Sequence, residues 1–355
     1  MTRVSSDFDL KKQSDISVAL ATYNGGRFLR EQLDSLARQT LLPRELVVTD
    51  DGSSDDTLEI VESFARTAPF PVRSYRNERR YGYADNFLQA VSLCRGEWVA
   101  FCDQDDVWFD TKLAICAQHF TDSFDVTLVV HSAQTWDGKS PLVRRFPHFT
   151  STSLLSAGTS NPFQLTPGFA MVFRRELLSL VDFTNRPGCI FGPRGASVMA
   201  HDSWIWMLAT STGSVVTLAE ALAFYRQHPT NTVGAPRKKG ILSKVRMSLR
   251  TVDYAYLAEI EATIADILND VAARLDAPHA AVTREISKSM RRRSEMLSQR
   301  ESLYNPSSSI LRRIQSFRQI ARLGGYASDQ SKMRLGKNAL IKDTLLGVTG
   351  LFPKS

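Results

Sequence analysis

Cysteine is scarce in this sequence, since the 355 residues include only Cys94, Cys102, Cys116 and Cys189. Their spacing matches no zinc-binding pattern, and four cysteines in a chain of this length are too few for a disulfide-stabilised scaffold. We therefore expect reduced cysteines packed in a hydrophobic core. A core of ordinary size is also expected, because hydrophobic residues make up 43% of the chain and charged residues 23%.

Long apolar segments and a secretory leader are lacking as well. No stretch approaches the roughly 18 consecutive apolar residues of a membrane-spanning helix. Residues 1–20 have a polar start and a short apolar run, without the basic start, long apolar core and small-residue cleavage site of a signal peptide. The sequence therefore predicts a cytoplasmic protein.

The net charge of +7 is unevenly distributed. Residues 236–355 contain 22 Lys and Arg against 11 Asp and Glu, whereas residues 1–235 contain 22 against 26. The segment VGAPRKKG, whose Gly and Pro are typical of a boundary, separates the two parts. We expect one domain at residues 1–235 and a basic helical extension at residues 236–355.

A strand–turn–helix pattern repeats in the first part of the chain. Strands are predicted at residues 16–23, 45–50, 72–77 and 97–102, and helices at residues 28–40, 56–66, 83–94 and 108–120. This alternation predicts an α/β fold with a mainly parallel sheet flanked by helices and with ligands at the carboxyl ends of the strands. Two acidic turns, TDDGSSDD and CDQDD, follow such strands, so they are expected to face one cleft.

Three carboxylates directly follow the apolar run VAFC. Asp103 and Asp105 are two residues apart, so on a continuing strand they point to the same side, and Asp106 would come from the next turn. Oxygen ligands of this kind suit a hard cation such as Mg²⁺ or Mn²⁺. The alternative is a polar loop whose aspartates cap the following helix.

Five motifs occur in succession between residues 15 and 235. They are ISVALATYNGGRFLREQLDSLARQT, ELVVTDDGSSDDT, GEWVAFCDQDDVWFDTKL, AHDSWIWMLA and YRQHPTN. The succession resembles the inverting family 2 glycosyltransferases with the GT-A fold, and within them a rhamnosyltransferase-like branch. The resemblance implies transfer of a sugar from a nucleoside diphosphate to an acceptor hydroxyl.

The resemblance also assigns donor-side residues. Thr22, Tyr23 and Asn24 fall at the nucleotide-sugar site, with Tyr23 packed on the base. Asp51 matches the carboxylate that bonds the pyrimidine ring N–H, although Asp50 and Asp51 could instead cap the next helix.

The acidic loop and the YRQH motif are assigned to the diphosphate and its metal. The resemblance places Asp105 near the ribose or donor sugar and Asp106 on the metal, with Asp105 and His228 as further candidate ligands. Arg226 would reach the diphosphate or the metal. A lone histidine is more often structural, and Pro229 replaces the glycine usual in the family's YRQHGxN.

Three residues are assigned to the acceptor side. Asp202 matches the general base that accepts the acceptor's proton, or it could cap the helix that follows. Gly168 would permit close backbone approach, and Trp204 would touch sugar, unless both are ordinary packing residues.

The implied donor is dTDP-L-rhamnose, with a UDP-hexose as the alternative, and the implied acceptor is a cell-surface polysaccharide or lipid-linked glycan. In the basic extension, one side of a predicted helix is apolar and arginines lie mostly elsewhere. The apolar side consists of Ile310, Leu311, Ile314, Phe317 and Ala321. Such a helix fits peripheral binding to an anionic membrane surface or packing on the catalytic domain.

Two other functions fit fragments of the sequence. DQDDV satisfies the D-x-D-x-[TV] pattern of haloacid-dehalogenase-type phosphatases, with Asp103 as nucleophile and Asp105 as acid, but there it normally follows the first strand. The basic extension could bind nucleic acid, but it lacks interleaved aromatic residues, so no nucleic-acid partner is expected.

Overall fold

The computed structural model describes residues 13–120, 125–190, 194–195, 197–229, 231, 252–326, 335 and 337–350. The chain divides into two compact units that interleave along the sequence. The first unit takes Met1–Leu154, Leu165–Leu177 and Ser214–Ala235, and the second takes Leu155–Gln164, Leu178–Gly213 and Pro236–Ser355. Two segments inside the range 1–235 therefore belong with the C-terminal helices rather than with the sheet.

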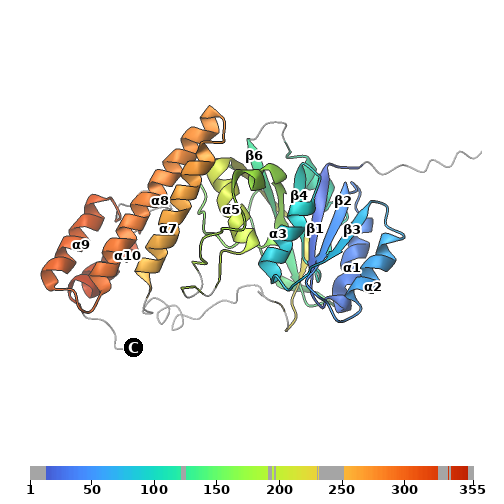
Figure 1. Cartoon of the computed structure of the whole chain (residues 1–355), viewed down its shortest axis with the longest axis horizontal. Helices are drawn as coiled ribbons and strands as arrows, with labels where there is room; N and C mark the ends of the chain where they lie inside the picture. The colour runs from blue at the N-terminus through green and yellow to red at the C-terminus, as the bar shows by residue number, and fades with distance from the viewer. Residues whose placement is uncertain are drawn as a thin grey trace, which may run out of the picture. The chain divides into compact units, whose positions relative to one another are not determined.

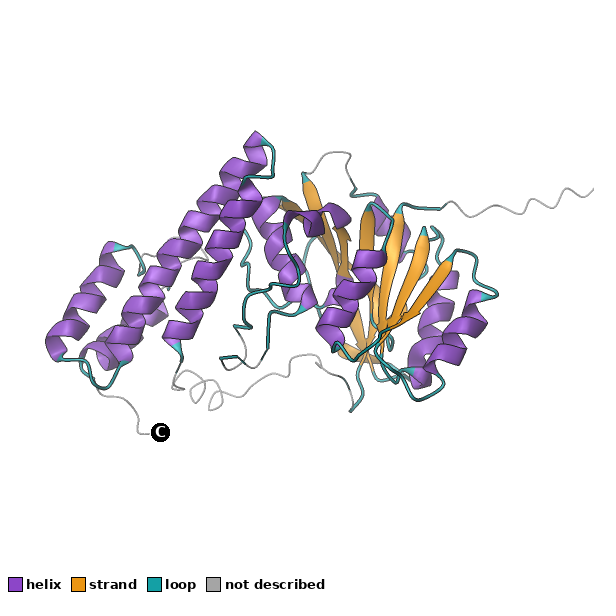
Figure 2. Ribbon diagram, in the orientation of Figure 1, coloured by secondary structure: helices purple, strands orange, loops and turns teal. Residues whose placement is uncertain are grey.

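A ten-stranded mixed sheet is the centre of the first unit (Figure 2). The strand order is β3-β2-β1-β4-β9-β6-β10-β5, with β7 paired to β6 and β8 to β10. The strands are β1 (Ile16–Thr22), β2 (Glu45–Asp50), β3 (Val72–Arg76), β4 (Trp98–Cys102), β5 (Val107–Trp108), β6 (Val126–Trp136), β7 (Pro141–Arg145), β8 (Ser153–Leu155), β9 (Met171–Arg174) and β10 (Ser214–Arg226). Strands β1 to β4 pair in parallel, whereas β9 runs antiparallel to β4 and β6. The predicted α/β class with a mainly parallel sheet is confirmed.

The segments between the strands form helices because their apolar residues recur at helical spacing. Helices α1 (Gly26–Ala37), α2 (Thr57–Ala65) and α3 (Tyr83–Leu93), labelled in Figure 1, connect the parallel strands β1 to β4, and α4 (Lys112–Ala117) follows β5. In α1, for example, Leu29, Leu33 and Leu36 are fully buried. Burial of such a stripe is what holds an amphipathic helix against a sheet.

The strand register brings the two acidic turns to one edge of the sheet. Strand β1 pairs in parallel with β2 and with β4, so that Thr22 lies opposite Asp50 and Leu20 opposite Cys102. The turns after β2 and β4 therefore leave the same edge on either side of β1, as the strand pattern predicted.

The predicted helix at residues 108–120 is shorter than expected. Val107 and Trp108 form strand β5, which pairs antiparallel with Phe224 and Ala223 of β10, and the helix begins only at Lys112. A sequence window cannot show this pairing, because the partner strand lies more than a hundred residues away.

The second unit is helical, which confirms the predicted helical C-terminal extension. Its main helices are α5 (His201–Thr212), α7 (Tyr254–Ala272), α8 (Ala277–Tyr304), α9 (Ile310–Arg322) and α10 (Lys337–Lys342), followed by the π-helical turn η3 (Asp343–Val348). Asp343 is buried and accepts hydrogen bonds from Arg300, Tyr304 and Tyr326. This polar cluster joins α8 to the last described turn.

Helix α9 buries only part of the side that its apolar residues form, with Phe317 packed against the buried cluster of Met296, Leu303 and Ile320. Its buried residues are Arg313, Ser316 and Ile320, whereas Ile310 and Leu311 are 68% and 66% exposed. Arg313 can be buried because its guanidinium donates to the carbonyl oxygens of Asn305, Pro306, Ser308 and Gly347. Helix α9 thus packs within the second unit and leaves part of its apolar surface open. Among the described helices, none is both long and apolar enough to cross a membrane.

Candidate functional site

The ends of β1 and β2 are joined by side-chain hydrogen bonds. Thr22 Oγ1 donates to Asp50 Oδ2 over 2.9 Å, and Asp50 Oδ1 accepts the N–H groups of Gly52 and Ser53. Thr22 and Asp50 are buried. Their hydrogen bonds link the two strand ends and give the Asp50 carboxylate donors from the turn that follows it.

Tyr23 and Asn24 follow β1 at this edge. The Tyr23 N–H donates to Gln104 Oε1 over 3.0 Å, and Gln104 Nε2 donates back to the Tyr23 carbonyl, which ties the turn to the acidic loop. Asn24, at a φ of 47°, accepts the Ser54 N–H with its Oδ1. Tyr23 is 38% exposed, the Arg80 guanidinium lies 4.0 Å from its ring centroid, and its packing on a nucleobase stays a prediction. The link through Gln104 was not foreseen from the sequence.

Asp51 is buried and its carboxylate organises the loop that leads to α3. Its oxygens accept the N–H groups of Tyr81 and Gly82, each over 2.7 Å, and the amide of Asn77 over 3.0 Å. A carboxylate can accept about four hydrogen bonds, so one further donor can be accommodated. The predicted bond to a pyrimidine N–H stays a prediction.

The three carboxylates after β4 form a cluster. Ligand atoms of Asp103, Asp105 and Asp106 lie within 4.8 Å of one another. Asp106 is fully buried, and burial, reinforced by the neighbouring charges of Asp105 and Asp103, raises its pKa well above the usual range. Its Oδ1 accepts the Arg226 N–H over 2.9 Å, whereas its buried Oδ2 has no hydrogen-bond partner among the described residues. An unsatisfied buried carboxylate oxygen beside two more carboxylates fits a divalent cation, which would supply the missing partner.

His228 and Asn231 of the YRQHPTN motif hold Asp105. His228 Nε2 lies 2.7 Å from Asp105 Oδ2, and the Asn231 amide donates to the same oxygen over 3.3 Å. His228 therefore contacts a candidate metal ligand, and its own role as a ligand stays a prediction. The contribution of Asn231 was missed, although it closes the motif that the sequence singled out.

Arg226 joins the YRQH motif to the acidic loop. Its Nε donates to the Asp105 carbonyl over 2.6 Å, and its terminal nitrogen pairs with Glu31 over 2.5 Å. The guanidinium lies 4.6 Å from the ring centroid of Phe28 and 4.3 Å from that of Trp136. Through these contacts Arg226 stabilises the acidic loop. Its predicted contact with the diphosphate stays a prediction.

A buried lysine lies behind the acidic loop, and sequence reasoning missed it. Lys112 is fully buried, its Nζ donates to the Phe169 carbonyl over 2.7 Å, and it lies 3.3 Å from the centroid of the Trp108 ring. Burial lowers its pKa to about 8, against the opposing effect of nearby thiols and of Asp106 and Asp103. Gly168, predicted at the acceptor side, is buried in the short 3-10 turn η1 (Gly168–Ala170). The carbonyl that Lys112 binds belongs to the next residue of this turn, Phe169.

Asp202 and Trp204 belong to the second unit. Asp202 lies in the first turn of α5 and accepts the Ser203 N–H over 2.6 Å, while Ala200 occupies the N-cap position. Trp204 is fully buried, and its indole N–H has no hydrogen-bond partner among the described residues. Burial lowers the pKa of His201 to about 4, so its ring is neutral near pH 7. The burial of Trp204 favours packing, and the acceptor-side roles of both residues stay predictions.

Part of the chain that carries this site is similar to a known protein family. Residues 17–181 match the family model described as Glycosyl transferase family 2. An uncharacterized glycosyltransferase of Nostoc is 30% identical over 223 residues, which cover 61% of this chain and 66% of that protein. The dTDP-rhamnosyl transferase RfbG of Shigella flexneri is 27% identical over 228 residues, covering 61% and 74%. The chain spans less than two thirds of the length of several relatives, for example 59% of an uncharacterized Mycobacterium tuberculosis protein.

A solved structure shares the fold. The crystal structure of residues 1–349 of S. aureus TarS in complex with UDP-GlcNAc aligns with a TM-score of 0.50 and 20% identity, covering 87% of this chain and 80% of that one. At this identity the likeness shows the fold alone, and it confirms the predicted GT-A-like fold. The family model spans β1, both acidic turns and η1. Residues 17–181 of this chain are therefore similar to the family described as Glycosyl transferase family 2.

Proposed function

We propose that the protein is an inverting glycosyltransferase that moves a sugar from a nucleoside diphosphate to an acceptor hydroxyl. The observation that carries the proposal is the carboxylate cluster at the strand edge of the region similar to family 2, where buried Asp106 keeps one oxygen unpartnered among the described residues. Asp105 and Asp106 would hold Mg²⁺ or Mn²⁺. When bound, the cation neutralises charge on the leaving diphosphate.

The chain's own residues would do the rest. Thr22 and Asp50 fix the turn from which Tyr23 and Asn24 project toward the nucleotide. Asp202 would accept the proton of the acceptor hydroxyl as its oxygen attacks the anomeric carbon from the face opposite the diphosphate, which inverts the configuration.

For the donor we propose dTDP-L-rhamnose. The DQDDVW, HDSW and YRQH motifs resemble the rhamnosyltransferase-like branch, and the dTDP-rhamnosyl transferase RfbG is 27% identical over 228 residues. The acceptor would be a growing polysaccharide or lipid-linked glycan, met at the cytoplasmic face of a membrane to which the basic extension binds peripherally.

The test is donor hydrolysis across a panel of nucleotide sugars. The full chain is incubated with dTDP-L-rhamnose, UDP-GlcNAc, UDP-glucose or GDP-mannose, with Mg²⁺ or Mn²⁺ or with EDTA, and the released sugar is followed by NMR. We expect turnover of dTDP-rhamnose with inverted configuration, lost in EDTA. Turnover of UDP-sugars alone would overturn the donor, and no turnover of any donor would overturn the function.

The general base has its own variant. Asp202→Asn is expected to lower kcat by roughly 10² to 10⁴, the usual contribution of a general base, while the dissociation constant of the donor nucleotide stays unchanged. A loss of nucleotide affinity with an unchanged rate for bound donor would make Asp202 a binding residue.

The phosphatase alternative depends on Asp103 as a nucleophile. Its motif follows β4, the fourth strand along the chain, rather than the first strand. Formation of a phospho-aspartate on Asp103 during incubation with a phosphate ester would nevertheless support it.

A further inference from the structure

The loop Leu155–Gln164 is attached to helix α5 within the second unit. The Gly158 N–H donates to the Thr210 carbonyl over 2.8 Å, and the Trp206 indole N–H donates to the Asn161 carbonyl over 2.8 Å. These two bonds join one side of the loop to α5, the helix whose first turn carries Asp202.

Helix α8 contacts both the loop and α5. A Cβ on Gly158 would lie 3.1 Å from Ile286, so the loop backbone comes close to this helix. Thr283 Oγ1 donates to the Ser211 carbonyl at the end of α5 over 2.9 Å. Farther along α8, the Arg293 guanidinium lies 5.7 Å from the centroid of the Phe163 ring. Three points of α8 therefore hold the loop and α5 together.

Arg293 is itself anchored by a buried carboxylate on α7. Its Nε lies 2.9 Å from Glu261 Oε1, and the side chains of Arg293 and Glu261 are 23% and 4% exposed. Burying a carboxylate is unfavourable even when it is paired, and this ion pair is weak evidence of a stabilising role. Its position suggests another purpose, since Glu261 directs the guanidinium toward the face of Phe163, where a cation and an aromatic ring attract each other.

We propose that Arg293 is a positioning residue, which holds α5, and with it Asp202, in place through Phe163 and the loop Leu155–Gln164. The basic extension is then part of the acceptor-side machinery rather than an appendage. This inference rests on the proposed function insofar as Asp202 is the general base, and the experiment separates the two.

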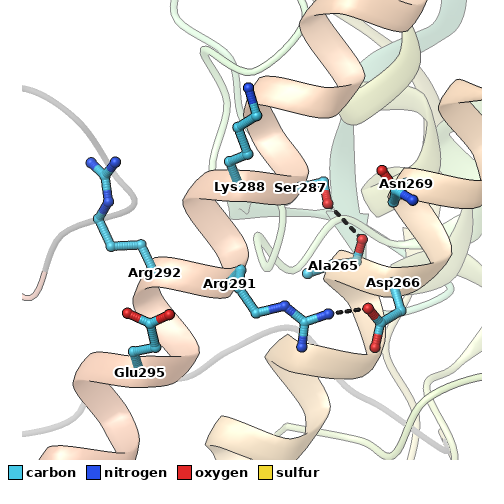
Figure 3. A pocket seen from close by; sticks show the side chains of 8 residues that line it. All are labelled: Ala265, Asp266, Asn269, Ser287, Lys288, Arg291, Arg292 and Glu295. Atoms are coloured by element: carbon cyan, nitrogen blue, oxygen red, sulfur yellow. Dashed lines mark hydrogen bonds and ion pairs between the residues drawn. The ribbon is translucent and has the colours of Figure 1, made fainter.

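The same helix offers a matched control. Arg291 also forms an ion pair with α7, to Asp266, in a shallow groove of about 360 Å³ between the helices (Figure 3). Both side chains are exposed, Arg291 at 44% and Asp266 at 69%. Arg291→Met also removes an arginine and an α7–α8 ion pair, but an exposed pair, at this groove and not at Phe163.

The first measurement is hydrogen–deuterium exchange in the full-length chain. In Arg293→Met we expect faster exchange in peptides that cover residues 155–164 and 201–212, and wild-type exchange in peptides that cover residues 16–22 and 45–50. Arg291→Met is expected to match the wild type throughout. Wild-type exchange of α5 in Arg293→Met, or equal changes in both variants, would overturn the proposal.

The second measurement is donor hydrolysis with Mn²⁺. We expect Arg293→Met to lower kcat about tenfold with an unchanged KM for the donor, because a small displacement of a reacting group has large kinetic effects. Arg293→Lys, which keeps the cation, should recover part of the rate. An unchanged kcat despite faster exchange of α5 would refute the link to catalysis.

Phe163→Leu tests the same contact from the loop and decides the matter if Arg293→Met fails to fold. It should reproduce the exchange pattern and the fall in kcat, and wild-type exchange of α5 in this variant would overturn the proposal. If the wild-type chain hydrolyses no nucleotide sugar, the proposed function fails, while the exchange measurements still decide whether Arg293 positions α5.

Discussion

Asp106 gives the sharpest prediction at the scale of single residues. Its pKa is raised because the ionised carboxylate is buried beside two others, so that charge destabilises the fold unless a cation compensates it. In EDTA, Asp106→Asn should therefore raise the melting temperature above that of the wild type. Added Mn²⁺ should stabilise the wild type and leave the variant unchanged, as measured by calorimetry, and donor hydrolysis should be lost.

Asp50 provides the control. It is equally buried at the end of the neighbouring strand, but its carboxylate accepts hydrogen bonds from Thr22, Gly52 and Ser53. Asp50→Asn should lower the free energy of unfolding by about 1–3 kcal/mol, because donors lose their acceptor. That loss should be the same with and without Mn²⁺. An Asp106→Asn variant that behaved like Asp50→Asn would argue against a metal at the cluster.

Lys112 predicts a pH dependence. Its pKa of about 8 in the folded protein lies below the ordinary value of 10.5, so between these values the unfolded chain binds more protons and stability rises with pH. Between about pH 8 and pH 10, the free energy of unfolding should therefore rise by up to about 3 kcal/mol more in the wild type than in Lys112→Met. Denaturant unfolding of both proteins across this range gives the difference, and a constant difference would contradict the burial of a charged Lys112.

At this scale the sequence revealed the carboxylates but not their partners. Asp103, Asp105 and Asp106 stand out because three charges follow an apolar run, and their clustering was predicted. Lys112 could not be recognised, since a lysine at the start of a helical segment ordinarily faces water. Nor could the engagement of Asp51 with the Tyr81–Gly82 backbone, because it depends on how a distant loop folds back.

At the scale of elements, α9 has one side that packs within the second unit and exposed apolar residues that could bind a surface. Arg313, Ser316 and Ile320 face the second unit, whereas Ile310 and Leu311 are exposed. The double substitution Ile310→Ser and Leu311→Ser should leave the melting temperature unchanged, because neither side chain is buried. If the extension binds membranes, the variant should sediment less with vesicles containing phosphatidylglycerol, most clearly at low salt. Unchanged sedimentation would place any membrane contact elsewhere.

The elements that sequence patterns predicted well are those that depend on local periodicity. Strands β1, β2 and β4 and helices α1 to α3 lie close to their predicted ranges, since each has a clear apolar repeat. Strand β5 and the buried face of α9 were not predicted. Strand β5 forms only by pairing with β10. The buried side of α9 depends on carbonyl oxygens that accept hydrogen bonds from the Arg313 guanidinium, and no apolar pattern encodes these bonds.

At the scale of the whole molecule, the interleaved units predict how truncation acts. A chain ending at residue 235 keeps α5 and the loop Leu155–Gln164 but loses their partners Thr283, Ile286 and Arg293. We expect α5 in this shortened chain to exchange its amide hydrogens rapidly, while the dTDP affinity of the sheet, measured by calorimetry, is largely retained. Full protection of α5 without residues 236–355 would show that the extension is dispensable for it.

The place of β10 in the sheet has a consequence for synthesis of the protein. It lies between β6 and β5, and it is the last strand along the described chain. Until β10 has emerged from the ribosome, β6 lacks this neighbour, and the segment that contains α5 emerges before it. Such long-range closure slows folding and leaves a strand edge open to wrong pairing. Protease resistance of the sheet should therefore appear late in the nascent chain, in one step, once β10 has emerged.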